Sequence, residues 1–207
     1  MDWYFDFISP YSYLQHERMP AWPAGVTLVP KPILFAGLLG HWGQRGPAEI
    51  PAKRTFTYRQ VQWLARRDGV PMKFPPRHPF NPIAALRVAV ALDNDRAAIA
   101  AIFRFIWAEG GAVDTPEGWA ELVRRLGVAD ADARIADPAV KERLRRNGDD
   151  AIAAGVFGVP TLAIDGQLFW GYDATAMALD YLRDPEGFIS EEMRRVDSLP
   201  TGSARKL

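Results

Sequence analysis

The sequence predicts an α/β fold in which a β-α-β unit near the N-terminus and a β-β-α unit near the C-terminus flank a long helical stretch. Residues 3–7 form a short, aromatic-rich segment, which is typical of a strand buried on both faces. Strand patterns return at residues 161–164 and 168–170, separated by the tight-turn pair Asp165-Gly166. Between the second and third strands, about 120 residues have mostly helical patterns.

Local signals justify the N-terminal unit. Ser9 is a good N-cap and Pro10 suits the first helical position, so we expect a helix over residues 11–19. Prolines end this helix, and residues 26–29 form the second strand. Because the order strand, helix, strand closes a parallel pair, the chain begins a parallel sheet.

The middle of the chain is expected to be helical apart from two stretches. Gly37, Gly40, Gly43 and Gly46 recur every three residues and predict a flexible loop rather than a phosphate cradle. Residues 74–82 hold four prolines and are expected to be extended. The helices are expected over residues 52–68, 83–92, 97–109, 116–126, 130–135 and 138–154.

A final helix is expected over residues 173–182, with a further one at 186–195. We therefore expect a thioredoxin-like domain made of residues 1–32 and 156–195, an inserted helical domain at 33–155 and a disordered tail at 196–207. Without the insertion the order is βαβ–ββα, which is the thioredoxin arrangement. The predicted fold class is α/β, a thioredoxin-like fold with a large helical insertion.

Composition and charge exclude several classes of protein. The 25 Lys+Arg balance the 25 Asp+Glu, which argues against nucleic-acid binding by phosphate neutralisation and against a polybasic membrane anchor. The chain has no cysteine, so it forms no disulfide and supplies no thiol of its own. The histidines His16, His41 and His78 lack metal-ligand spacing, so no metal is expected. The start Met1-Asp2-Trp3 lacks the basic region of a signal peptide, and we expect a cytoplasmic protein.

Three short segments carry the functional signal. Ser9-Pro10-Tyr11-Ser12 lies where a thioredoxin fold places Cys-x-x-Cys, with serine at both cysteine positions; the alternative is an ordinary helix cap. Pro160 enters a strand opposite that helix start, where a cis bond after Val159 exposes backbone groups that pair with an extended peptide. The alternative there is a plain strand-entry proline.

The third segment is Trp170-Gly171-Tyr172-Asp173, at the junction of the last expected strand and the helix expected over residues 173–182. Asp173 is either an N-cap or the receptor of a ligand ammonium, while helix N–H groups bind a carboxylate. Both charges occur together at an α-amino acid end.

Together these segments, residues 5–14, 157–161 and 170–173, resemble 2-hydroxychromene-2-carboxylate isomerases, relatives of the kappa-class glutathione transferases and DsbA-like proteins. Residues 52–54, 63–71 and 80–82 are also similar to that family, and the resemblance covers nearly all of residues 2–183. The chain departs from it at Gln60, where many members have Asp, and at Glu49-Ile50-Pro51.

The resemblance implies a glutathione-dependent isomerase that interconverts 2-hydroxychromene-2-carboxylate and trans-o-hydroxybenzylidenepyruvate by reversible thiolate addition. Ser9 corresponds to the family's catalytic serine, and we expect it to donate a hydrogen bond to the glutathione thiolate at a helix N-terminus. The expected partners are glutathione, a small aromatic carboxylate and a second copy of the chain. The expected glutathione contacts are Ser9, Lys53, Val159, Pro160, Trp170, Gly171, Tyr172 and Asp173, and the expected substrate contacts are Tyr11 and Asn81.

Two rival functions fit the same residues. A kappa-like transferase moves glutathione onto an electrophile and consumes it. A redox-inactive thioredoxin-like protein binds extended peptides beside Pro160 and catalyses nothing.

Overall fold

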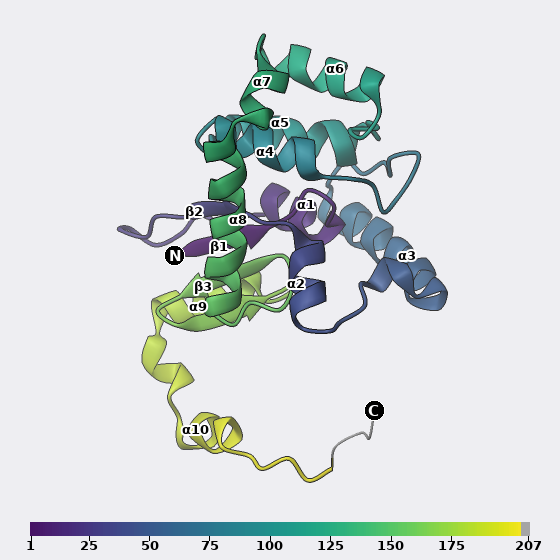
Figure 1. Cartoon of the computed structure of the whole chain (residues 1–207). Coiled ribbons are helices and arrows are strands. Elements are labelled where there is room, and N and C mark those ends of the chain that lie inside the picture. The colour runs from purple at the N-terminus through teal and green to yellow at the C-terminus, as the bar shows by residue number, and fades with distance from the viewer. Residues whose placement is uncertain (204–207) are drawn as a thin grey trace.

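A four-stranded sheet lies at the centre of the computed structural model, which describes residues 1–203 (Figure 1). The strand order is β2-β1-β3-β4; β1 and β2 are parallel, and β3 runs antiparallel to both β1 and β4. This topology confirms the predicted α/β fold in its thioredoxin arrangement. The strands are β1 (Asp2–Phe5), β2 (Val29–Pro32), β3 (Thr161–Ile164) and β4 (Gln167–Trp170).

Helices cover the sheet and extend from it on both sides, with α4 to α7 stacked at one end and α9 at the other (Figure 1). The chain from β2 to β3 is helical, as expected. The α-helices are α1 (Pro10–Glu17), α2 (Phe35–His41), α3 (Pro51–Asp68), α4 (Ile83–Ala91), α5 (Arg96–Phe103), α6 (Pro116–Leu126), α7 (Ala131–Ala136), α8 (Pro138–Ala153), α9 (Thr175–Arg183) and α10 (Glu191–Asp197). Shorter elements are the 3-10 helices η1 (Pro47–Glu49) and η3 (Pro185–Phe188) and the π-helix η2 (Arg104–Ala108).

Strand β1 is buried on both faces, and its alternating side chains join two cores. Trp3 and Phe5 enter the main core, where Phe5 packs 5.5 Å from Phe103 of α5 between ring centroids. Tyr4 points to the opposite face, into a smaller core with residues of α2 and α8. The sheet and the helical insertion therefore share both hydrophobic cores. The division into two domains stays a prediction.

The second strand begins three residues later than predicted, at Val29 instead of Val26. It also ends at Pro32 instead of Val29, so it includes Pro30 and Pro32, and β2 is an edge strand of the sheet. The N–H groups of Val29 and Ile33 donate to Met1 and Phe5, at 3.0 and 2.9 Å. Proline is tolerated at an edge because the position without an N–H can face away from the neighbouring strand.

Three further boundaries differ from expectation. The glycine-rich stretch predicted as a loop begins with helix α2, because burial of Leu38 in the second core outweighs the low helix propensity of Gly37 and Gly40. Helix α9 begins at Thr175 rather than Asp173. Helix α10 continues to Asp197, so the first two residues of the expected disordered tail, 196 and 197, are helical, while residues 204–207 of that tail lie outside the described residues.

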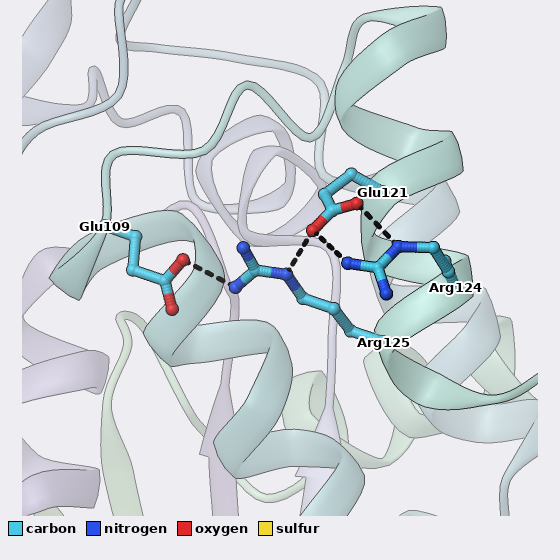
Figure 2. Close-up of polar contacts among 4 residues, drawn as sticks. All are labelled: Glu109, Glu121, Arg124 and Arg125. Carbon is cyan, nitrogen blue, oxygen red and sulfur yellow. Dashed lines mark hydrogen bonds and ion pairs between the residues drawn. The ribbon is translucent and has the colours of Figure 1, made fainter.

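A cluster of ion pairs lies on the surface of the insertion (Figure 2). Arg125 bridges Glu109 and Glu121, at 2.5 and 2.7 Å, and Arg124 forms a two-bond pair with Glu121. Exposed pairs of this kind contribute little to stability. Within residues 1–203 we find no helix that is both long and apolar enough to cross a membrane.

Gln15 joins four parts of the fold that surround the end of the sheet. Its buried amide oxygen accepts from the Trp3 indole N–H at 2.7 Å. Its amide nitrogen donates to the Gly171 carbonyl and the Thr175 hydroxyl, at 3.2 and 2.9 Å. Strand β1, helix α1, the turn after β4 and helix α9 are thus connected through one side chain.

We predict that Gln15→Leu lowers the free energy of unfolding by about 1–3 kcal/mol, because it leaves the buried Trp3 N–H without an acceptor. Urea unfolding followed by tryptophan fluorescence measures the change. Gln62→Leu, at an exposed position of α3, is the matched control and should change stability by less than about 0.5 kcal/mol. Equal stabilities of the two variants would contradict the prediction.

Candidate active site

The ends of β1 and β3 bring the predicted site residues to one edge of the sheet. Tyr4 pairs with Thr161, so the chain leaving β1 towards Ser9 and the chain entering β3 from Pro160 lie at the same edge. The Val159-Pro160 bond is cis, which confirms the prediction. The Pro160 carbonyl accepts from the Gly171 N–H at 2.8 Å, which fixes the turn after β4 beside it.

Ser9 caps helix α1 and is nearly buried, with 7% of its surface exposed. Its Oγ accepts from the Ser12 N–H at 3.2 Å, and Pro10 occupies the first helical position. An accepting hydroxyl keeps its own proton free to donate. The Oγ of Ser12, one turn further, is buried and has no hydrogen-bond partner within residues 1–203. The helix cap is therefore present, and it leaves two serine hydroxyl groups free to donate.

The backbone of Val159 offers a second set of free groups. Among the described residues its N–H and C=O take part in no hydrogen bond, although the residue is buried. Trp170 of β4 lies close by: its indole packs edge-on against Phe157 at 5.1 Å between centroids, and 53% of its surface is exposed. A Cβ at Gly158 would collide with the Trp170 indole, so a larger residue here would have to displace that exposed side chain. The free N–H and C=O of Val159 can pair with an extended chain, and the exposed Trp170 ring can contact an apolar group of that chain.

The turn after β4 carries Tyr172 and Asp173. The Tyr172 hydroxyl donates to the Asp68 carboxylate at the end of α3, so it is already engaged within the protein. Asp173 is exposed, and it does not cap α9, since no side chain caps that helix. The interpretation of Asp173 as an N-cap is therefore wrong, because the helix begins two residues later. Gly171 adopts a φ of 99°, and a Cβ there would lie 2.6 Å from Asp173 Oδ1.

Tyr11 connects this edge to helix α3. Its hydroxyl donates to Gln60 Oε1 at 2.7 Å. Burial, together with the nearby Asp173 carboxylate, raises the pKa of Tyr11. Lys53 lies seven residues before Gln60 on α3, so it shares that face of the helix, about 10 Å further along the axis. Lys53 is exposed.

Asn81 makes its contacts within the insertion. Its Oδ1 accepts from the Ile83 N–H at 3.0 Å at the start of α4, and its own N–H reaches Asp114. No described residues form a cluster of three or more His, Cys, Asp or Glu able to hold a metal.

A family model of the DSBA-like thioredoxin domain matches residues 1–183. The chain belongs to this family. Two curated relatives are 32% identical to this DSBA-like chain. "Glutathione s-transferase kappa 2" of Caenorhabditis elegans covers 88% of this chain over 91% of its own length, and 2-hydroxychromene-2-carboxylate isomerase of Sphingobium xenophagum covers 89% over 98%.

A solved structure of 2-hydroxychromene-2-carboxylate isomerase superposes on this DSBA-like chain with a TM-score of 0.75 and 26% identity, covering 92% of this chain and 98% of that one. A probable DsbA oxidoreductase of Streptomyces coelicolor, at 19% identity and a TM-score of 0.68, shares the fold. These findings confirm the resemblance to both the isomerases and the kappa-class transferases.

Sequence reasoning missed three side chains that hold the turn before Ser9 in this DSBA-like fold. The Asp6 carboxylate accepts from the Ile8 N–H at 3.0 Å, His78 contacts the Ile8 carbonyl at 2.9 Å, and the Trp107 indole donates to the Phe7 carbonyl at 2.8 Å. One signal was visible, since Asp6 is a charged residue in an apolar strand. His78 and Trp107 lie far away in the sequence, and nothing local points to them.

Asp6 is fully buried, and the hydrogen bonds to its carboxylate come from backbone N–H groups. Burial raises the pKa of Asp6 to about 7, against the lowering effect of the N–H groups of Phe35, Ile8 and Phe7. The folded protein therefore binds this proton more tightly than the unfolded chain. The contribution of Asp6 to stability is complete below its usual pKa of 3.8 and is lost as the pH rises through about 7.

We predict that the stability of the wild type relative to Asp6→Asn falls as the pH rises from about 5 to about 8, because only the wild type releases this proton. Urea unfolding at both pH values measures the difference. Asp68→Asn is the control: Arg67 and Tyr172 lower the pKa of Asp68 to about 2, so Asp68 stays ionised throughout and its difference should not change. A pH-independent difference for Asp6→Asn would disprove the assigned shift.

Proposed function

We propose that this protein is a glutathione-dependent cis–trans isomerase acting on 2-hydroxychromene-2-carboxylate or a related small aromatic carboxylate. One observation carries the proposal. In a chain without cysteine, the unbonded backbone of Val159 beside a cis-proline and the start of a helix capped by Ser9 occur at the same end of the sheet. The isomerase relatives and the solved isomerase structure support it. The expected homodimer and cytoplasmic location belong to the same proposal.

The residues at the sheet edge fit glutathione. The free N–H and C=O of Val159 match the peptide groups of its cysteinyl residue. The exposed Asp173 carboxylate suits the γ-glutamyl ammonium, and Lys53 suits a carboxylate. The partnerless buried Oγ of Ser12 is explained if a polar ligand reaches the helix start. When bound, glutathione supplies the nucleophilic thiolate that the chain lacks.

Ser9 and helix α1 hold the negative charge of that sulfur. Because Ser9 Oγ accepts from the Ser12 N–H, the Ser9 hydroxyl proton is directed away from the helix and towards a ligand. The positive end of the helix dipole favours the thiolate in the same place. Near-complete burial of Ser9 lowers the local dielectric and strengthens both effects. Ser9 thus stabilises a thiolate and makes no covalent bond.

Tyr11 and the face of α3 that carries Gln60 form the side of the site assigned to the substrate. The raised pKa of Tyr11 keeps its hydroxyl protonated, and the single proton that it donates to Gln60 in this structure can be donated to a substrate carboxylate instead. Asn81 belongs to the proposal through the family resemblance, since its contacts in this structure are at the start of α4. Trp170, with its exposed ring, offers an apolar surface beside Val159.

A kappa-type glutathione transferase is the second candidate, favoured by the relative from Caenorhabditis elegans. One assay separates the two. With 2-hydroxychromene-2-carboxylate, the isomerase changes the ultraviolet spectrum and leaves the titratable glutathione thiol constant. Loss of one thiol for each substrate converted would identify the transferase. Binding of extended peptides without turnover of either kind would support the peptide-binding alternative.

We predict that Ser9→Ala raises the pKa of bound glutathione, because one charge-assisted hydrogen bond, about 1.5–3 kcal/mol, is lost. That energy corresponds to roughly one to two pKa units. Since a free thiol has a pKa of about 8.5, the variant should lose most activity near neutral pH and regain part of it towards pH ~9. A pH–rate profile with and without glutathione measures this. An equal loss at every pH, or wild-type turnover without glutathione, would contradict the mechanism.

We predict that Asp173→Asn weakens glutathione binding by about 1.5–3 kcal/mol, since it removes the charge that faces the ammonium. Its melting temperature should not change, because Asp173 caps no helix. Calorimetric titration and thermal unfolding measure the two quantities. Asp180→Asn, an exposed carboxylate on α9, is the matched control and should bind glutathione like the wild type. Unchanged affinity in Asp173→Asn would remove this residue from the site.

A further inference from the structure

The two peptide groups that flank Ile8 are held by side chains from two distant parts of the chain. On one side, the Ile8 N–H donates to Asp6 Oδ1 at 3.0 Å. On the other, the Ile8 carbonyl lies 2.9 Å from His78 Nε2. The next bond along the turn, from the Ser9 N–H to the Asp6 carbonyl at 3.1 Å, completes the connection to Ser9. We call Asp6, Ile8 and His78 the turn clamp.

Asp6 also connects the turn clamp to the start of α2, which follows strand β2. Its other oxygen, Oδ2, accepts from the Phe35 N–H at 2.8 Å, at the first residue of α2. A buried carboxylate without a cation is costly, and an apolar residue in this place costs less. The Asp6 carboxylate accepts hydrogen bonds from the Ile8 and Phe35 N–H groups, which an apolar residue could not do. These hydrogen bonds fix the β1–α1 turn relative to the start of α2.

His78 approaches the following peptide group, between Ile8 and Ser9, from the insertion. Since a carbonyl only accepts, His78 Nε2 carries the proton and donates to Ile8. Its Nδ1 then faces the Tyr58 hydroxyl at 2.6 Å, and that hydroxyl also lies 2.9 Å from the His78 carbonyl, so its one proton is shared between the two acceptors. Aromatic rings surround the imidazole, with Phe74, Phe80 and Trp107 at centroid distances between 5.5 and 6.2 Å. The ring is thereby oriented by its packing and by both of its nitrogen atoms.

We propose that Asp6 and His78 are positioning residues, which hold the peptide groups on the two sides of Ile8 and so set the direction of the Ser9 hydroxyl. This inference rests on the proposed function, because Ser9 matters only if a ligand sulfur lies before it. With its N–H and C=O both bonded, the Ile8 backbone cannot rotate without breaking one of them. A small displacement of a catalytic group costs up to about 100-fold in rate.

The turn clamp weakens when Asp6 is protonated, since a neutral carboxyl group accepts weaker hydrogen bonds from the two N–H groups than a carboxylate does. Burial raises the pKa of Asp6 to about 7, and the groups that face it are the backbone N–H groups of Phe35, Ile8 and Phe7. Within residues 1–203 no charged side chain contributes to this pKa. His78 is faced by Tyr58. Burial raises the pKa of Tyr58, and the positive charge of Arg54 acts in the opposite direction. Burial lowers the pKa of His78, which keeps it neutral.

The first test needs neither glutathione nor substrate. In a pH titration of the wild type followed by amide NMR, we expect the Ile8 and Phe35 resonances to shift together, with a common midpoint near the Asp6 pKa of about 7. Asp6→Asn should abolish both shifts. Ile8 and Phe35 amides that do not respond to pH, or that still titrate in Asp6→Asn, would overturn the role of Asp6.

The second test compares three histidine variants in the presence of glutathione. His78→Phe keeps the ring packing but removes the donor to Ile8; we expect kcat to fall by about tenfold or more, with the KM for glutathione little changed. The pKa of the bound thiol, read from ultraviolet thiolate absorbance, should rise. His78→Gln restores an N–H donor and should recover most of both losses. His16→Phe, at the far end of α1, should alter stability without changing kcat or the thiol pKa.

The outcomes separate the positioning role of the turn clamp from the proposed glutathione-dependent function. If His78→Phe and His78→Gln behave alike, or if His78→Phe matches His16→Phe, the turn clamp does not position Ser9. If the wild type binds no glutathione while the Ile8 and Phe35 amides titrate together, the proposed function fails and the coupling of Asp6 to the turn stands. If glutathione binds with a lowered thiol pKa in the wild type and in His78→Phe alike, the proposed function stands and the positioning role is wrong.

Discussion

The hydrogen bonds that reach the turn between β1 and α1 set the geometry on which the rest of the site depends. Asp6 bonds to the N–H of Ile8, His78 bonds to its carbonyl, and Trp107 bonds to the carbonyl of Phe7. Two of these three side chains belong to the helical insertion. The insertion therefore does more than enlarge the core, because it supplies the groups that hold the start of α1. Removing it would leave two backbone carbonyls of the turn without their partners.

The opposite wall of the site follows from the sheet. The pairing of Tyr4 with Thr161 places the cis-proline segment beside that turn, and Gln15 links α1 to the Gly171 carbonyl. The result is a fixed frame around groups that are left unpaired: the Val159 peptide, the Ser9 proton and the Ser12 hydroxyl. Native proteins pair most buried polar groups, so these free groups at one end of the sheet support the proposed ligand site.

Much of this fold could be predicted from the sequence, because its signals are local. The serine-proline start of α1, the Asp165-Gly166 turn and the long periodic helices each follow from neighbouring residues. The errors have tertiary causes: β2 accepts prolines because it is an edge strand, and α2 forms over glycines because Leu38 is buried. His78 could not be assigned to the site, since its bond to Ile8 spans 70 positions. Asp6 was visible as a charge in an apolar strand, but its partners were not.

The proposed site requires that the Val159 peptide and the start of α1 hold glutathione together. A crystal structure of the protein with glutathione bound tests this directly. We expect the cysteinyl N–H and C=O of glutathione to pair with the backbone of Val159, and its sulfur to lie within hydrogen-bond distance of Ser9 Oγ. Glutathione bound elsewhere, or with its sulfur remote from Ser9, would contradict the proposed site.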